Sequence, residues 1–177
     1  MSGISLWQQC KKGDSNAFRQ LYSDHIDALM AYGKKICPDN TLLEDAVHDL
    51  FVYIWDKRES LGDTDSVIRY LCASLRRRLV KDMENQGKFQ HPEHLENHLS
   101  ASVDSKESEW IREEHSLSQQ SALQIAISKL PKRQQEALHL KFYHNMSYED
   151  ICAVMDINYQ SVRNLISKAI IDLRTLL

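Results

Sequence analysis

The chain has 177 residues, with 22 Lys and Arg, 25 Asp and Glu, 5 Gly, 3 Pro and 42% hydrophobic residues. This length suits one domain or two small ones, and the shortage of Gly and Pro argues against a β-sandwich or barrel. No apolar run approaches the roughly 18 residues of a membrane span, and the first residues lack the pattern of a secretory leader. We therefore expect an all-α, cytoplasmic protein without direct membrane insertion.

The net charge of -3 is distributed unevenly along the chain. Residues 1–81 carry 12 basic and 11 acidic side chains, residues 82–128 carry 3 and 9, and residues 129–177 carry 7 and 5. The ends are therefore mildly basic (+1 and +2), and the centre is acidic (-6). Because local charge decides what a surface attracts, the overall charge does not exclude nucleic acid as a partner.

Three amphipathic helices are predicted in the first half of the chain. The first follows capping residues at 14–16 and extends to about Ile36. Thr41 and Glu44 form a capping-box pattern that would begin the second helix. The outer face of that helix is acidic and polar, with Glu44, Asp45, His48 and Asp49.

The third predicted helix follows a turn-rich segment at 62–66 and is strongly basic. Its cations outnumber those that a solvated face usually carries without acidic partners four residues away. They are Arg69, Arg76, Arg77, Arg78 and Lys81. Tyr70 lies among them, where helical spacing favours packing in the core over a base-stacking role.

The middle of the chain is polar and lacks sustained periodicity. We expect a flexible linker at 86–108 between two small helical domains at 1–85 and 109–177. The linker contains His91, His94 and His98, but nearby Gly and Pro disfavour a helix that would align them, so no metal site is expected. The four cysteines show no metal-binding spacing and are expected to be reduced and packed as small apolar side chains.

The second domain ends in a predicted helix-turn-helix. Ser147 and Asp150 form a capping pair for a short helix, Asp156 lies in a tight turn, and Asn158 can cap the final helix. Polar side chains that can contact bases or phosphates are expected on the outer face of this last helix. They are Tyr159, Gln160, Ser161, Arg163, Asn164, Ser167 and Lys168. An ordinary helical hairpin with a solvated face fits this pattern equally well.

Three motifs in order, however, resemble a known family. The first motif is Gly13-Asp14-x-x-Ala17-Phe18-x-x-Leu21-Tyr22, and the second is the segment from Glu44 to Trp55. The third extends from Leu130-Pro131-x-Arg133-Gln134 through Ser147-Tyr148-Glu149-Asp150-Ile151. They are similar to bacterial RNA polymerase sigma factors of the sigma-70 family, in the extracytoplasmic-function (ECF) subfamily. The resemblance covers nearly the whole chain, and residues 158–165 look like the version common in Bacteroidetes members.

The resemblance implies a transcription initiation factor with two DNA-contacting domains. The first, region 2, would bind core RNA polymerase and melt the -10 element of promoter DNA, and the second, region 4, would read the -35 element through the outer-face residues of the last helix. By position, core polymerase would be bound by Asp45, His48 and Asp49. By position, the -10 element would be contacted by Asp63, Thr64, Asp65, Ser66, Arg69, Arg76, Arg77 and Lys81.

The resemblance also implies an anti-sigma partner, often a membrane-anchored one of the FecR type. The chain departs from the family's usual pattern at residues 76–82, which leaves open which cation would meet which phosphate. An enzyme is not expected, because the sequence has no phosphate loop, nucleophile elbow or zinc-protease motif, and it implies no cofactor. A stand-alone helix-turn-helix regulator is the alternative, although it leaves the acidic and basic helices of the first domain without a purpose.

Overall fold

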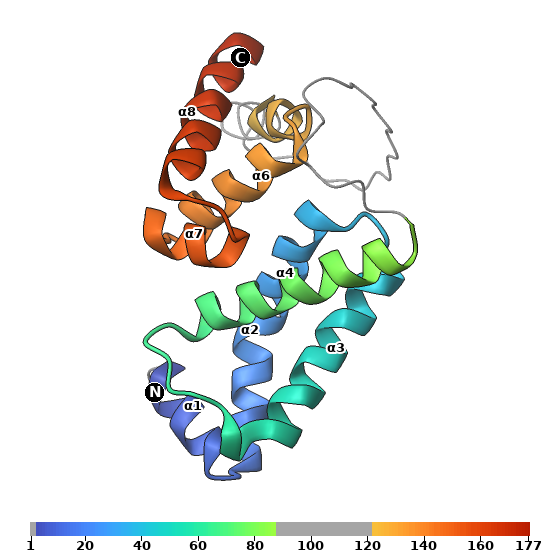
Figure 1. Ribbon diagram of the computed structural model, residues 1–177, viewed down its shortest axis with the longest axis vertical. Helices are drawn as coiled ribbons and strands as arrows, with labels where there is room; N and C mark the ends of the chain where they lie inside the picture. The colour runs from blue at the N-terminus through green and yellow to red at the C-terminus, as the bar shows by residue number, and fades with distance from the viewer. Residues whose placement is uncertain (1–2, 88–121) are drawn as a thin grey trace, which may run out of the picture.

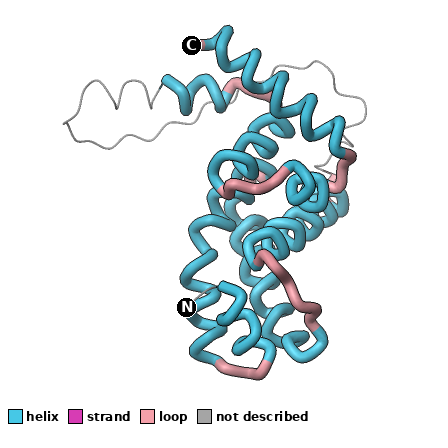
Figure 2. The backbone as a smooth tube through the Cα atoms, turned by 90° about the vertical axis from the view of Figure 1, so that its left-hand side faces the viewer, coloured by secondary structure: helices cyan, strands magenta, loops and turns pink. Residues whose placement is uncertain are grey.

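The computed structural model describes residues 3–87 and 122–177, and these residues form helices and short connections without a strand. Figures 1 and 2 show two helical domains packed against each other, with the chain's C-terminus at the far end of the second. The predicted all-α fold is therefore confirmed. The predicted linker lies almost wholly outside the described residues, as do the three clustered histidines and the start of the second domain.

The first domain contains four α-helices around one apolar core. They are α1 (Gly3–Lys11), α2 (Ser15–Ile36), α3 (Asn40–Lys57) and α4 (Val67–Asn85), with a short 3-10 turn η1 (Arg58–Ser60) after α3. Helix α2 packs against α1, α3 and α4, so the heptad-like apolar stripes of all four meet around it. Leu21, Leu29, Ile54 and Leu75 are fully buried there.

Side-chain caps fix where the helices of this domain begin. Asp14 caps α2 by accepting hydrogen bonds from the amides of Asn16 and Ala17. Asp39 caps α3, because its Oδ1 accepts from the Leu42 amide at 3.2 Å. The expected capping box of Thr41 and Glu44 is therefore wrong, since Thr41 already lies inside the first turn of the helix.

Helix α1 has no counterpart in the sequence-based prediction, although it completes the core. Leu6, Trp7 and Cys10 recur at three- and four-residue spacing and are buried, which is the pattern of a short amphipathic helix. Cys10, Cys37 and Cys72 are buried and form no disulfide, as expected. Burial raises the pKa of Cys72 to about 12, so this thiol is inert at neutral pH.

The second domain begins in described residues with a helical stretch at 122–128. It continues with α6 (Lys132–Leu138), a π-helical turn η3 (His139–Tyr143), α7 (Tyr148–Met155) and α8 (Tyr159–Leu176). The predicted caps are confirmed: Ser147 and Asp150 form a capping box on α7, and Asn158 caps α8. Asp156 adopts a left-handed conformation between them, with φ 54°, which Asp tolerates better than most residues.

The two domains meet along two pairs of helices. Helix α6 packs against α2, and α7 packs against α4, as Figure 1 shows where the orange helices lie over the blue and green ones. Buried apolar side chains of both domains form one continuous cluster, which includes Leu79 of α4 and Ile151 of α7. Among the described residues, no helix combines the length and apolar character needed to cross a bilayer.

Candidate nucleic-acid interface

The outer face of α3 is acidic with an apolar centre. Asp45, His48 and Asp49 are exposed, as the sequence predicts, and Val52 and Tyr53 beside them are 43% and 47% exposed. The Oδ2 atom of Asp49 also accepts a hydrogen bond from Arg78 of α4 at 3.1 Å. Exposed apolar side chains next to carboxylates suit a protein partner that carries basic groups.

The loop at 62–66 is held in place by helix α1. The Trp7 indole donates to the carbonyl oxygen of Gly62 at 3.2 Å. Gln8 and Lys11 donate to Oδ1 of Asp63 at 2.9 and 2.6 Å, and these bonds lower the pKa of Asp63. Sequence reasoning missed these three anchors because they belong to the unpredicted helix.

Short polar side chains organise the remainder of this loop. The Thr64 hydroxyl donates to the Ser66 carbonyl at 3.0 Å and accepts from the Ser66 amide at 3.2 Å. Ser66 then caps α4, with its Oγ accepting from the Arg69 amide at 3.4 Å. The loop is therefore preorganised by hydrogen bonds, and its polar groups lie beside the start of the basic helix.

Four of the five cations of α4 divide into two groups, and the fifth, Arg78, pairs with Asp49 of α3. Arg77 and Lys81 are exposed and line a shallow hollow together with Tyr53 and Tyr70. Tyr70 is half-buried against the Trp7 ring, with centroids 5.0 Å apart, so it contributes both to the core and to this surface. Exposed cations beside aromatic rings are the side chains that hold single-stranded nucleic acid.

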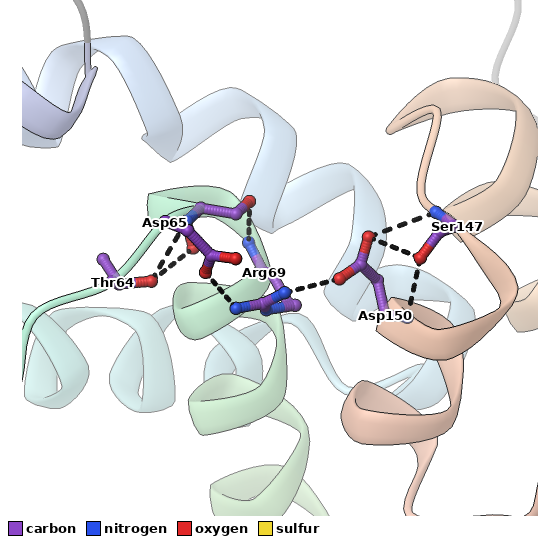
Figure 3. Close-up of polar contacts among 6 residues, drawn as sticks. Thr64, Asp65, Arg69, Ser147 and Asp150 are labelled. Carbon is purple, nitrogen blue, oxygen red and sulfur yellow. Dashed lines mark hydrogen bonds and ion pairs between the residues drawn. The ribbon is translucent and has the colours of Figure 1, made fainter.

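Arg69 belongs to the second group, whose members contact the other domain. Its guanidinium forms ion pairs with Asp65 of the loop and with Asp150 of α7, the latter at 2.6 Å. Figure 3 shows Arg69 between these carboxylates, with Asp150 also bonded to Ser147. The bonds from Arg69 and Ser147 outweigh burial and lower the pKa of Asp150.

Arg76 makes a more deeply buried contact with the other domain. Its Nε donates to Oε1 of Glu136 on α6 at 2.8 Å, and the Tyr32 hydroxyl donates to the same oxygen at 2.9 Å. Glu136 is only 5% exposed. Burial and the adjacent carboxylate raise the pKa of Tyr32 well above its usual range, so this hydroxyl remains a donor.

A cluster of rings surrounds this contact. His139 of η3 stacks on Tyr143 at 4.7 Å between centroids and lies edge-on to His144 at 5.0 Å, and both histidines approach Tyr32. Burial, with the cationic forms of His144 and Lys35 nearby, lowers the pKa of His139 to about 4. Burial and His25 of α2 lower the pKa of His144. Both imidazoles are therefore neutral at neutral pH.

The outer face of α8 is open. Its apolar side packs through Val162, Ile166 and Ala169, which are buried. The predicted DNA-contacting side chains lie on the opposite side, and all are exposed except the half-buried Ser161. Gln160 donates to Asn164 at 2.8 Å, which places two side-chain amides along one face.

Comparisons with known proteins agree with this geometry. Residues 120–173 match the family model for sigma-70, region 4, a family of transcription initiation factors that are not enzymes. The match includes α6, α7 and most of α8. A search of curated proteins found no match.

Two solved structures resemble the whole chain in fold. CnrH, in complex with the cytosolic domain of CnrY, is 20% identical with a TM-score of 0.63, covering 98% of this chain and 95% of that chain. The sigma factor RpoE from Bartonella quintana, in complex with the anti-sigma factor NepR, is 21% identical with a TM-score of 0.65, covering 90% and 95%. At this identity the likeness concerns the fold.

Proposed function

We propose that this protein is an ECF-type sigma factor that binds core RNA polymerase and directs promoter-specific transcription initiation. The observation that carries the proposal is the combination of a region 4 match at 120–173 with a fold likeness to a sigma factor over 90% of the chain. A stand-alone helix-turn-helix regulator would not require the first domain, with its acidic α3 and basic α4.

In this proposal the three surfaces have separate roles. Asp45, His48 and Asp49 bind core polymerase, with Val52 and Tyr53 adding apolar contact. The loop from Asp63 to Ser66 holds an unpaired base of the -10 element through its polar groups. The strand that follows is bound at its phosphates by Arg69, Arg76, Arg77 and Lys81.

The -35 element is proposed to lie along the exposed face of α8. The amides of Gln160 and Asn164 suit adenine edges, and Arg163 and Lys168 suit guanine edges or phosphates. Tyr159, Ser161 and Ser167 complete that surface. An anti-sigma partner is also proposed, since CnrH and RpoE were each solved with a second protein. That this partner is of the FecR type, and that the chain belongs to the Bacteroidetes-like subgroup, remain predictions from the sequence.

Co-purification with core RNA polymerase tests the proposal. The wild-type chain should be retained by core enzyme, and Asp49→Arg should weaken retention about tenfold or more, because a like charge would face the basic partner. Glu59→Arg is the matched control: it makes the same charge change on the exposed η1 turn and should bind as the wild type does. A folded wild-type chain that does not bind core polymerase would refute the sigma-factor proposal.

A further inference from the structure

A hollow of about 450 Å³ lies where the end of α2 meets the π-helical turn η3, so both domains line it. Its lining consists of Asp27, Met30, Ala31, Lys34, Lys35 and His139. This volume falls within the range of about 300 to 1,000 Å³ that small-molecule sites occupy. None of the surfaces assigned above to polymerase or to DNA includes a residue of this hollow, so it is a separate feature of the molecule.

Cations from both domains approach one another beside the hollow. Lys35 is half-buried, and burial together with the charge of Lys132 on α6 lowers the pKa of its ammonium group. Among the described residues, no ion pair includes Lys34, Lys35 or Lys132. These three ammonium groups against the one carboxylate of Asp27 leave a charge of +2 around the hollow. A concave surface with this excess of positive charge attracts anions, and a bound anion would relieve the repulsion between the two domains' lysines.

An aromatic surface continues from the hollow toward solvent. The Tyr143 ring stacks on the His139 ring, with centroids 4.7 Å apart and planes 17° apart. Tyr143 is 64% exposed, and the apolar side chains of Met30 and Ala31 line the same hollow as His139. Nucleobases stack on exposed aromatic side chains of this kind. Rings beside unpaired cations therefore suit a ligand that has a flat base at one end and phosphates at the other.

We propose that this hollow binds a free nucleotide, with its phosphates on Lys34, Lys35 and Lys132 and its base against His139 and Tyr143. Phosphate oxygens accept charge-assisted hydrogen bonds from ammonium groups, and the carboxylate that lines the hollow can accept a bond from a ribose hydroxyl. Because the ligand contacts both domains, its binding stabilises their contact. The site does not depend on the sigma-factor proposal, since none of its residues is assigned to polymerase or to DNA.

Isothermal titration calorimetry of the full-length chain with ATP tests the phosphate contacts, at about 50 mM NaCl so that charges are weakly screened. Lys35→Gln and Lys132→Gln should each weaken ATP binding about three- to tenfold, because each removes one charge-assisted contact. Lys12→Gln is the matched control: it removes the same charge from the exposed turn between α1 and α2 and should bind ATP as the wild type does. Circular dichroism reports folding, and the exposed Lys132 keeps the test decisive if the half-buried Lys35 is needed for stability.

Inorganic triphosphate separates the phosphate contacts from the base contact. Tyr143→Ala should weaken ATP binding about fivefold or more and leave triphosphate binding unchanged, because a stacking surface is lost. Tyr143→Phe keeps the ring and should bind ATP as the wild type does. Equal affinity of the wild type for ATP and for triphosphate would overturn the assignment of the ligand as a nucleotide.

Three further results would overturn the proposal. The first is no detectable binding of ATP at about 1 mM, and the second is an equal loss of affinity in Lys12→Gln and Lys132→Gln. The third is displacement of bound ATP by an oligothymidine about 12 nucleotides long, which would assign the cations to the backbone of a nucleic acid. Core polymerase binding is measured separately, so its failure would refute the proposed function and leave the result for the nucleotide unchanged.

Discussion

Helices α4 and α8 both present cations proposed to contact DNA, but the two helices differ in what surrounds those cations. On α4, Arg69 and Arg76 form ion pairs with the second domain, whereas Arg163 and Lys168 on α8 are exposed. The number of basic side chains on a helix therefore does not measure how many are available to a ligand. In a two-domain protein, availability depends on how the domains are docked.

The largest expected effect comes from a substitution that disturbs the core of the first domain, on which α4 packs, and leaves α8 intact. A Cβ at Gly33 would lie 2.2 Å from Cδ1 of the buried Leu43, so Gly33→Ala should destabilise the first domain by about 1–3 kcal/mol through overpacking. Chemical denaturation followed by circular dichroism measures this loss. Gly62→Ala is the control, since its Cβ would meet no atom within 4 Å; equal stability of the two variants would contradict the packing described for α2 and α3.

The next largest effect is expected from removing the cations on the exposed face of α8. Arg163→Ala combined with Lys168→Ala should weaken binding of duplex DNA by the full-length chain about 10- to 100-fold at low salt, with the salt slope reduced by about 0.9 for each lost phosphate contact. Anisotropy with a labelled duplex measures both values. Unchanged affinity would mean that α8 does not contact DNA.

A smaller effect distinguishes the two groups of cations on α4. Arg77→Ala should weaken oligothymidine binding by the free chain about fivefold, because one exposed phosphate contact is lost. Arg76→Ala should change it less than about twofold, because that guanidinium is already occupied and its removal also loosens the docked domain. The two variants are compared in one titration series, and equal losses would show that Arg76 is as available as Arg77.

The smallest effect concerns pH. Because the pKa of His139 is about 4 in the docked chain and 6.5 is its ordinary value, the separated or unfolded state binds more protons between these values. Docking should therefore be fully stable above about pH 6.5 and weaken as the pH falls toward about 4. The pKa values of His144 and His25 are also lowered, so protonation of these imidazoles should weaken docking too. The positive charge of Lys35 also lowers the pKa of His139.

Scattering profiles of the wild type at about pH 7.5 and about pH 5 measure this change as an increase in the radius of gyration. His139→Gln should reduce the difference between the two conditions, since one of the three titrating imidazoles is removed. A radius of gyration that falls on acidification would contradict the burial of neutral histidines at the contact.

Local features of the fold were predictable from the sequence because they depend on neighbouring residues. Ser147, Asp150 and Asn158 act as caps where the pattern placed them, and the outward side of α8 follows from its apolar spacing. One local prediction was wrong, because Asp39 precedes Thr41 and caps α3. Helix α1 was not predicted, because a short helix with three buried apolar residues gives only a weak periodic pattern.

The docking of the domains was not predictable in the same way. Arg69 and Asp150 are 81 positions apart, and many other charge pairs along the chain would have matched as well. Burial of Glu136 contradicts the usual expectation that a charged residue on a helix faces solvent, and its carboxylate is bonded to Tyr32 of α2 and Arg76 of α4 in the other domain. The contacts between the domains could be known only from the structure, and they determine which cations of α4 are available to a ligand.

The most direct test of the account is run-off transcription by core RNA polymerase on the promoter upstream of this protein's own operon. The wild-type chain should convert inactive core enzyme into one that produces a single defined transcript, and Asp49→Arg and the double variant of Arg163 and Lys168 should lose that transcript while Glu59→Arg retains it. If folded wild-type protein bound to core polymerase gives no defined transcript, the assignment of this chain as an initiation factor for that promoter is contradicted. If the transcript is unaffected by these variants, the roles assigned to the exposed faces of α3 and α8 are contradicted.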